Sequence, residues 1–157
     1  MDINIGISEG NRQKVALELS KLLADEYVLY TKTKEAHWNV EGVDFSDKHK
    51  LFDEQVEQIS RSIDSVAERI RTLGYLVPAT LNSFLELTHL TENSVLKSDS
   101  RAYMNELLMA HETIIRHLRE NISLFADKYG DLGTSDFITS LMQEHEKTAW
   151  ILRAHLK

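Results

Sequence analysis

Four side chains that can bind a metal ion lie along one uninterrupted segment of the chain. They are His49, Asp53, Asp64 and Glu68. On an α-helix they fall at angles of roughly 0, 40, 60 and 100°, so imidazole nitrogen and carboxylate oxygen share one face. Each pair is spaced i, i+4, but about 16 Å of helix axis separates Asp53 from Asp64. One helix therefore carries two half-sites and cannot close a single site with all four side chains.

The numbering of these residues predicts how the half-sites are completed. Positions 49 and 68 have the same midpoint as positions 53 and 64. An antiparallel copy of the same helix, crossing near Ser60, would therefore bring His49 and Asp53 against Asp64 and Glu68 of a second subunit. A two-fold dimer is isologous, so this pairing makes two equivalent sites. The alternative is that Asp64 and Glu68 are ordinary solvated acids at i, i+4 spacing.

Composition limits both the class of protein and the kind of metal. The 157 residues are 42% hydrophobic and 27% charged, which suits one folded domain. Because the chain has no cysteine, a metal must be held by His, Asp, Glu or water, which favours iron or manganese over structural zinc. The net charge of −7 disfavours binding to nucleic acids, because the overall electrostatic field of the protein repels their phosphate groups. With no leader and no long apolar run, we expect a cytoplasmic protein without a membrane segment.

Glycine and proline divide the chain into helical segments, because both residues are unfavourable inside helices. Between them, apolar side chains recur in steps of three and four, the pattern of a helix with one buried face. The pattern predicts four long helices. They cover residues 8–39, 43–73 and 98 or 99–128, and a final segment that Thr134 caps.

The connections predict the fold. Residues 40–45 and 129–134 form short connections, so the helices that they join should be antiparallel. Residues 74–97 form a long crossover, with a short helix expected at 81–87. A long middle connection is typical of the ferritin-like plan. We therefore expect an all-α, ferritin-like four-helix bundle that occupies residues 1–157 as one domain.

The standard ferritin-like di-iron site is absent from the sequence. It needs a Glu-x-x-His motif on each of two core helices. Only Glu86 and His89 have this spacing, and they lie in the crossover, so we interpret them as surface residues. His111 and His145 lie on or beside apolar stripes, and we expect hydrogen-bonded core or interface residues there rather than ligands.

A set of motifs extends over essentially the whole chain. They are His37-Trp38-Asn39-Val40, Gly42, Phe45, His49, Phe52-Asp53, Asp64, Ala67-Glu68-Arg69-Ile70, Leu73-Gly74, His145-Glu146-Lys147-Thr148-Ala149-Trp150 and Leu152-Arg153-Ala154. This set resembles the Dps proteins, the small twelve-subunit ferritin relatives of bacteria and archaea. The resemblance implies a homododecamer with a ferroxidase centre at each two-fold interface.

The resemblance also implies the ligands. The family's pattern falls on His37, His49 and Asp53 of one subunit and on Asp64 and Glu68 of the other, so His37 joins the four residues found by spacing. The centre would oxidise Fe(II) to Fe(III) with hydrogen peroxide or oxygen, and the shell would store the ferric mineral and so protect against oxidative damage.

Trp38 matches the family's tryptophan beside the site, where it would serve as an electron donor. Its alternative role is an aromatic packed at an interface.

The same resemblance suggests where iron enters and where mineral forms. Entry pores are expected near the start of the last helix, lined by Asp136 and, less directly, by Asp131 and Glu144. Asp136 also suits the first turn of a helix for dipole reasons alone. Glu54 and Glu57 are candidates for mineral nucleation, but many relatives have an acid at the position of Lys50.

Two other functions remain as alternatives. Some Dps proteins condense DNA through lysine-rich tails, but residues 1–13 contain no lysine and only one arginine, and the chain ends at Lys157 directly after the last predicted helix. We therefore expect weak DNA binding at most. An inert shell or adhesion-like surface protein is the other alternative, and the five matching ligand positions argue against it.

Overall fold

The computed structural model describes residues 3–92 and 97–157, and these residues form helices and connections without a β-strand. The elements are α1 (Glu9–Asn39), α2 (Phe45–Thr72), α3 (Leu81–Leu87), α4 (Ser100–Ser123), the π-helix η1 (Leu124–Lys128) and α5 (Leu132–Leu156). None of these helices is long and apolar enough to cross a membrane.

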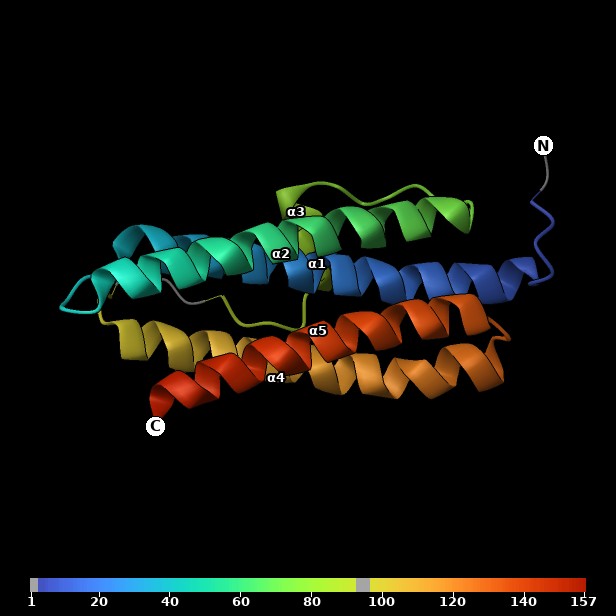
Figure 1. Ribbon diagram of the computed structural model, residues 1–157. Helices are drawn as coiled ribbons and strands as arrows, with labels where there is room; N and C mark the ends of the chain where they lie inside the picture. The colour runs from blue at the N-terminus through green and yellow to red at the C-terminus, as the bar shows by residue number, and fades with distance from the viewer. Residues whose placement is uncertain (1–2, 93–96) are drawn as a thin grey trace.

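The four long helices run along one axis as a bundle, and the crossover that carries α3 lies on its outside (Figure 1). Helix α2 packs mainly on α1, and α5 packs mainly on α4. Helix α3 is held against α1, where the rings of Tyr27 and Phe84 stack with centroids 4.1 Å apart. The predicted all-α bundle, with a long crossover and a short extra helix, is confirmed.

Capping residues set where the helices begin. Ser8 caps α1, as its Oγ accepts a hydrogen bond from the backbone of Asn11. The predicted cap of the last helix was wrong. Its N-cap is Asp131, three residues before Thr134, because the Asp131 carboxylate accepts hydrogen bonds from both the backbone N–H and the hydroxyl of Thr134.

The predicted third helix ends in a wider turn. Residues up to Lys128 are helical as expected, but the last five form η1, which ends where the Tyr129 N–H bonds to the Leu124 carbonyl at 3.2 Å. Phe125, within this turn, is 1% exposed and belongs to the core.

The core contains a polar network among its apolar side chains. Glu26 on α1 is fully buried, and His145 on α5 places its Nε2 atom 2.7 Å from the Glu26 Oε1 atom. The Nδ1 atoms of His145 and of His111 on α4 lie 2.9 Å apart. This confirms the expectation that His111 and His145 are hydrogen-bonded core residues.

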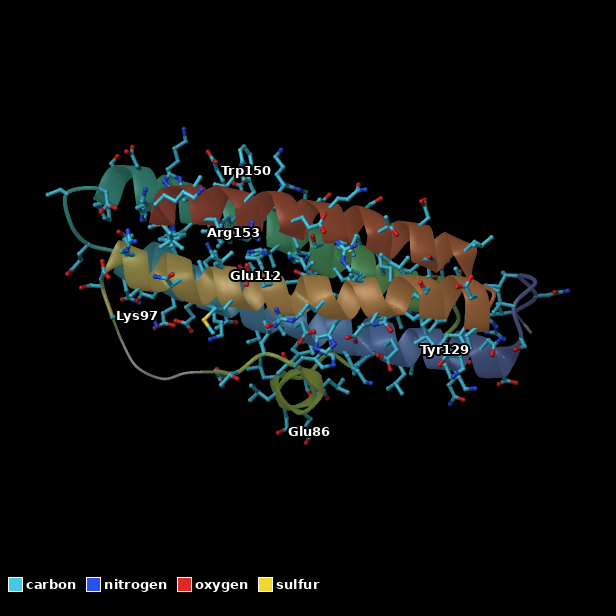
Figure 2. All side chains as sticks on the ribbon, turned by 90° about the horizontal axis from the view of Figure 1, so that it is seen from below. Glu86, Lys97, Glu112, Tyr129, Trp150 and Arg153 are labelled. Atoms are coloured by element: carbon cyan, nitrogen blue, oxygen red, sulfur yellow. The ribbon has the colours of Figure 1, made fainter. Side chains whose placement is uncertain are left out.

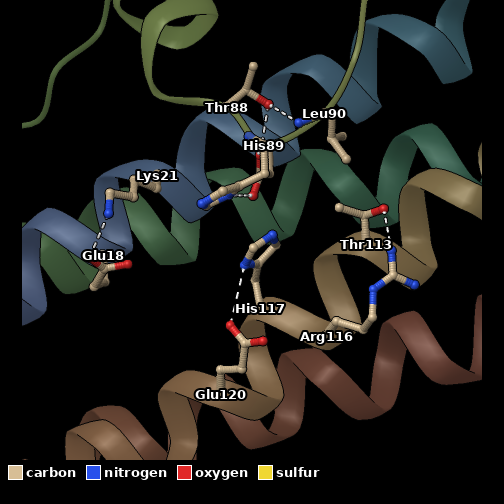
Figure 3. A network of polar contacts seen from close by, with 10 residues as sticks. Glu18, Lys21, Thr88, His89, Leu90, Thr113, Arg116, His117 and Glu120 are labelled. Carbon is tan, nitrogen blue, oxygen red and sulfur yellow. Dashed lines mark hydrogen bonds and ion pairs between the residues drawn. The ribbon is translucent and has the colours of Figure 1, made fainter.

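The crossover is attached to α1 through one buried carboxylate. Asp25 accepts hydrogen bonds from the Thr88 hydroxyl at 2.7 Å and from the His89 backbone N–H at 2.6 Å, and the His89 Nδ1 atom lies 2.8 Å away. The His89 ring stacks on His117 of α4 at 3.8 Å (Figure 3). Glu86 is exposed as expected and points away from the bundle (Figure 2), whereas the side chain of His89 is only 29% exposed because its ring lies between Asp25 and His117.

Candidate metal centre

Three of the predicted ligands lie together at the end of the bundle where α1 turns into α2. His37 stands near the C-terminus of α1, and His49 and Asp53 occupy the first turns of α2. The two imidazole rings stack with centroids 3.9 Å apart, and the His37 Nε2 atom lies 3.7 Å from the Asp53 Oδ1 atom. The short α1–α2 connection therefore brings the three residues of the first predicted half-site together within a single subunit.

Reciprocal hydrogen bonds fix the two histidines of this half-site. The His37 Nδ1 atom lies 3.0 Å from the His49 carbonyl oxygen, and the His49 Nδ1 atom lies 2.8 Å from the His37 carbonyl oxygen. A carbonyl only accepts hydrogen bonds, so both Nδ1 atoms carry the proton. In the neutral rings, both Nε2 atoms keep a lone pair free for a metal, the arrangement that is usual for ligating histidines.

A lysine stands at the edge of the half-site. The Lys34 Nζ atom lies 4.0 Å from the Asp53 Oδ1 atom and 5.9 Å from the centre of the Trp38 ring. Its positive charge partly balances the Asp53 carboxylate. Lys34 is not among the residues predicted from the sequence. Its spacing of three residues before His37 on one helix was the only available signal.

Asp64 and Glu68, the residues predicted to form the second half-site, lie farther along the same helix. Both side chains are exposed on α2. Near the first half-site, Trp38 is 70% exposed and Phe45 is 47% exposed. Within the described ranges, no group of three or more His, Asp or Glu side chains of one subunit is arranged to hold a metal ion. The five predicted ligands thus lie as two separated groups on one subunit.

Comparison with known proteins places the fold in a family. The protein-family model described as the ferritin-like domain matches residues 16–157 of this chain. The chain is 40% identical over 155 residues to a low temperature-induced protein of Nostoc, covering 99% of this chain and 87% of that protein. It is 33% identical over 138 residues to the DNA protection during starvation protein of Helicobacter pylori, covering 88% of this chain and 95% of that protein.

Solved structures agree with these relatives. The Dps protein of Vibrio cholerae O1 matches with a TM-score of 0.93 and 32% identity, over 100% of this chain and 98% of that one. DpsC of Streptomyces coelicolor matches with a TM-score of 0.95 and 28% identity, over 100% and 91%.

This chain belongs to the Dps family of ferritin-like proteins. The Vibrio cholerae Dps protein is described as a member of a broad superfamily of ferritin-like diiron-carboxylate proteins.

The acids expected to line an entry pore differ in their surroundings in this Dps chain. Asp131 is 2% exposed, caps α5, and accepts a hydrogen bond from the Arg69 guanidinium at 3.2 Å. Asp136 and Glu144 are exposed on α5. Asp131 therefore has a structural role in the subunit, and Asp136 and Glu144 are the two exposed acids of the three.

The candidate nucleation residues of this Dps chain lie on α2. Glu54 and Glu57 are exposed. The Lys50 Nζ atom lies 3.9 Å from the Glu54 Oε1 atom, at the surface. A cation therefore stands beside Glu54, one of the two acids.

Proposed function

We propose that this Dps protein oxidises Fe(II) at dinuclear sites between two subunits and stores the ferric product inside a closed homododecamer. The observation that carries this proposal is the reciprocal pair of hydrogen bonds between His37 and His49. It leaves the Nε2 lone pairs of both rings free before any ion arrives, and the His37 Nε2 atom lies 3.7 Å from the Asp53 Oδ1 atom. Membership of the Dps family supports the same function.

Each site would use His37, His49 and Asp53 of one subunit and Asp64 and Glu68 of the partner subunit. Iron is the substrate here. Oxygen and imidazole nitrogen donors favour Fe(III) over Fe(II), so they make bound Fe(II) a stronger reductant. Two Fe(II) ions give one electron each to a hydrogen peroxide molecule, which takes up two protons and leaves as two water molecules. No hydroxyl radical is released. Oxygen is the alternative oxidant.

Two neighbours would support this chemistry. Lys34 balances the charge of Asp53 while the site holds no iron, and an incoming ion must compete with it. Trp38 would either donate an electron to the site or pack against the partner subunit, and its exposed ring suits both roles. Asp136 and Glu144 would attract iron at an entry pore, and Glu54 and Glu57 would begin mineral growth.

The experiment is an anaerobic titration of the iron-free protein with Fe(II), followed by hydrogen peroxide. We expect rapid oxidation in the natural protein and slow oxidation in an Asp64→Ala plus Glu68→Ala variant. A matched control is Asp47→Ala plus Glu112→Ala, which removes the same two charges from other surfaces. Equal oxidation rates in the natural protein and the first variant would exclude Asp64 and Glu68 from the reaction.

A further inference from the structure

A groove runs between α2 and α5, the two helices that share one face of the bundle in Figure 1. These helices pack mainly on other partners, and the groove between them has a volume of about 470 Å³. Its polar walls include Arg61, Ser62, Ser65, Ser140, Glu144 and Lys147. None of these residues except Glu144 belongs to the proposed iron chemistry.

The groove contains two cations, one on each wall. Arg61 stands on α2 and Lys147 on α5, and both side chains are exposed. In the part of the chain that the structure describes, the ion pairs all involve other residues. Two unpaired cations facing one recess are notable in a chain of net charge −7, because they make this groove locally attractive to an anion.

Three serine hydroxyls line the same groove. Ser62 and Ser140 donate to backbone carbonyls of their own helices, but at 3.3 and 3.4 Å, which are long distances for O–H···O hydrogen bonds. Ser65 makes a similar bond at 3.0 Å. These weak bonds within a helix can be exchanged for bonds to an anion when a hydroxyl rotates.

A smaller cavity adjoins the groove. A cavity of about 10 Å³, enough for one water molecule, shares Ser62 and Glu144 with the groove. Gln55 lines this cavity. Its side chain is buried, and neither its amide nitrogen nor its amide oxygen has a hydrogen-bond partner. A buried amide without partners points to a polar guest or water at this position.

We propose that the groove between α2 and α5 binds inorganic phosphate, held by Arg61, Lys147 and the hydroxyls of Ser62, Ser65 and Ser140. A guanidinium matches two oxygens of a tetrahedral oxyanion, while an ammonium adds a point charge from the opposite wall. The serine hydroxyls complete the set of donors. The phosphate site contains none of the five predicted iron ligands, so it can be tested independently of the proposed ferroxidase.

Glu144 opposes this binding, so replacing it should raise the affinity for phosphate and not lower it. Its carboxylate lines the same groove. A second negative charge within a few ångströms of a phosphate is repulsive. Replacing Glu144 with glutamine therefore strengthens phosphate binding, a gain that damage to the fold cannot produce.

The test is calorimetric titration of inorganic phosphate into the iron-free, assembled protein at constant low ionic strength. We expect saturable binding of one phosphate per subunit, a loss of about tenfold or more in affinity in Arg61→Gln plus Lys147→Gln, and tighter binding in Glu144→Gln. The control is Lys14→Gln plus Arg116→Gln. It removes the same charge away from the groove, and we expect its affinity to match that of the natural protein.

Three results would overturn the proposal. The first is titration without saturation in the natural protein, and the second is an equal loss of affinity in the control pair. The third is displacement of phosphate by a short single-stranded oligonucleotide with higher affinity, which would assign the cations to nucleic acid. Unchanged phosphate binding together with failed iron oxidation would reject the ferroxidase and leave this site intact.

Discussion

His37 and His49 each donate a hydrogen bond from Nδ1 to the backbone carbonyl of the other, at 3.0 and 2.8 Å. The acceptors are backbone atoms, so replacing one histidine side chain leaves the other correctly oriented. In His37→Ala we therefore expect Fe(II) binding to weaken by about tenfold or more through loss of one ligand, with His49 still in place. Calorimetry with Fe(II) under anaerobic conditions measures this. His155→Ala is the control, and equal weakening in both variants would contradict the assignment.

Lys34 should compete with iron for Asp53. Its ammonium lies 4.0 Å from a carboxylate that is 51% exposed, so the interaction is well screened and worth about 1 kcal/mol. In Lys34→Met we expect Fe(II) to bind about fivefold more tightly. Lys50→Met is the matched control, since Lys50 pairs with Glu54 instead. Weaker binding in Lys34→Met would show that Lys34 assists the site.

His111 should make stability depend on pH. Burial, with a contribution from the charge of His145, lowers the pKa of His111 well below its ordinary value near 6.5. Below that ordinary value the unfolded chain binds a proton that the folded protein does not. The free energy of unfolding therefore falls as the pH falls, with a limiting slope of about 1.4 kcal/mol per pH unit from this group.

Denaturant unfolding of the natural protein and of His111→Phe at a series of pH values tests this expectation. The variant should lose part of the pH slope, whatever its absolute stability. Glu26 and His145 also face this position and remain in both proteins. Identical slopes would mean that His111 takes up its proton equally in the folded and unfolded states.

Asp25 should be essential for holding the crossover on the bundle. Its Oδ1 atom accepts hydrogen bonds from the Thr88 hydroxyl and the His89 backbone, and its Oδ2 atom lies 2.8 Å from the His89 Nδ1 atom. Asp25→Asn removes the negative charge and sets an amide donor in place of one of these two oxygens. We expect a loss of about 1–3 kcal/mol in the free energy of unfolding. Glu86→Gln, on the exposed side of α3, is the control and should change little. Unchanged stability in Asp25→Asn would show that the negative charge of Asp25 does not help to hold the crossover.

DNA binding is the alternative function, and the net charge of −7 argues against it. A gel-shift assay with linear duplex DNA should show no stable complex at about 0.2 M salt. A complex that persists at that salt concentration would favour the alternative.

Local signals explain which parts of the fold were predictable. Helix α3 was predicted at the residues where it occurs, and the first helix was predicted to begin at Ser8, which is its N-cap in the structure. These boundaries were predictable because turn residues and apolar periodicity act within a few residues. The cap at Thr134 was wrong because Asp131 fits the same preference, and only the three-dimensional contacts decide between them. The π-helical turn likewise has no signature in the apolar period.

The candidate site stays a prediction, and its residues came from two kinds of signal. The helical spacing of His49, Asp53, Asp64 and Glu68 is a property of one helix, whereas His37 was added by family resemblance. The reciprocal hydrogen bonds between His37 and His49 and the approach of Lys34 to Asp53 depend on how α2 folds back along α1. They could therefore not be predicted from the spacing of residues within one helix.

The most direct measurement of the central claim is subunit complementation. One variant, His49→Ala plus Asp53→Ala, loses the first half-site, and another, Asp64→Ala plus Glu68→Ala, loses the second. Each should be inactive alone. When they are unfolded, mixed equally and reassembled, half of the two-fold dimers are mixed and each has one intact site, so about a quarter of the peroxide-dependent Fe(II) oxidation should return. If the mixture stays as inactive as the separate variants while reassembling normally, the metal site does not lie between subunits.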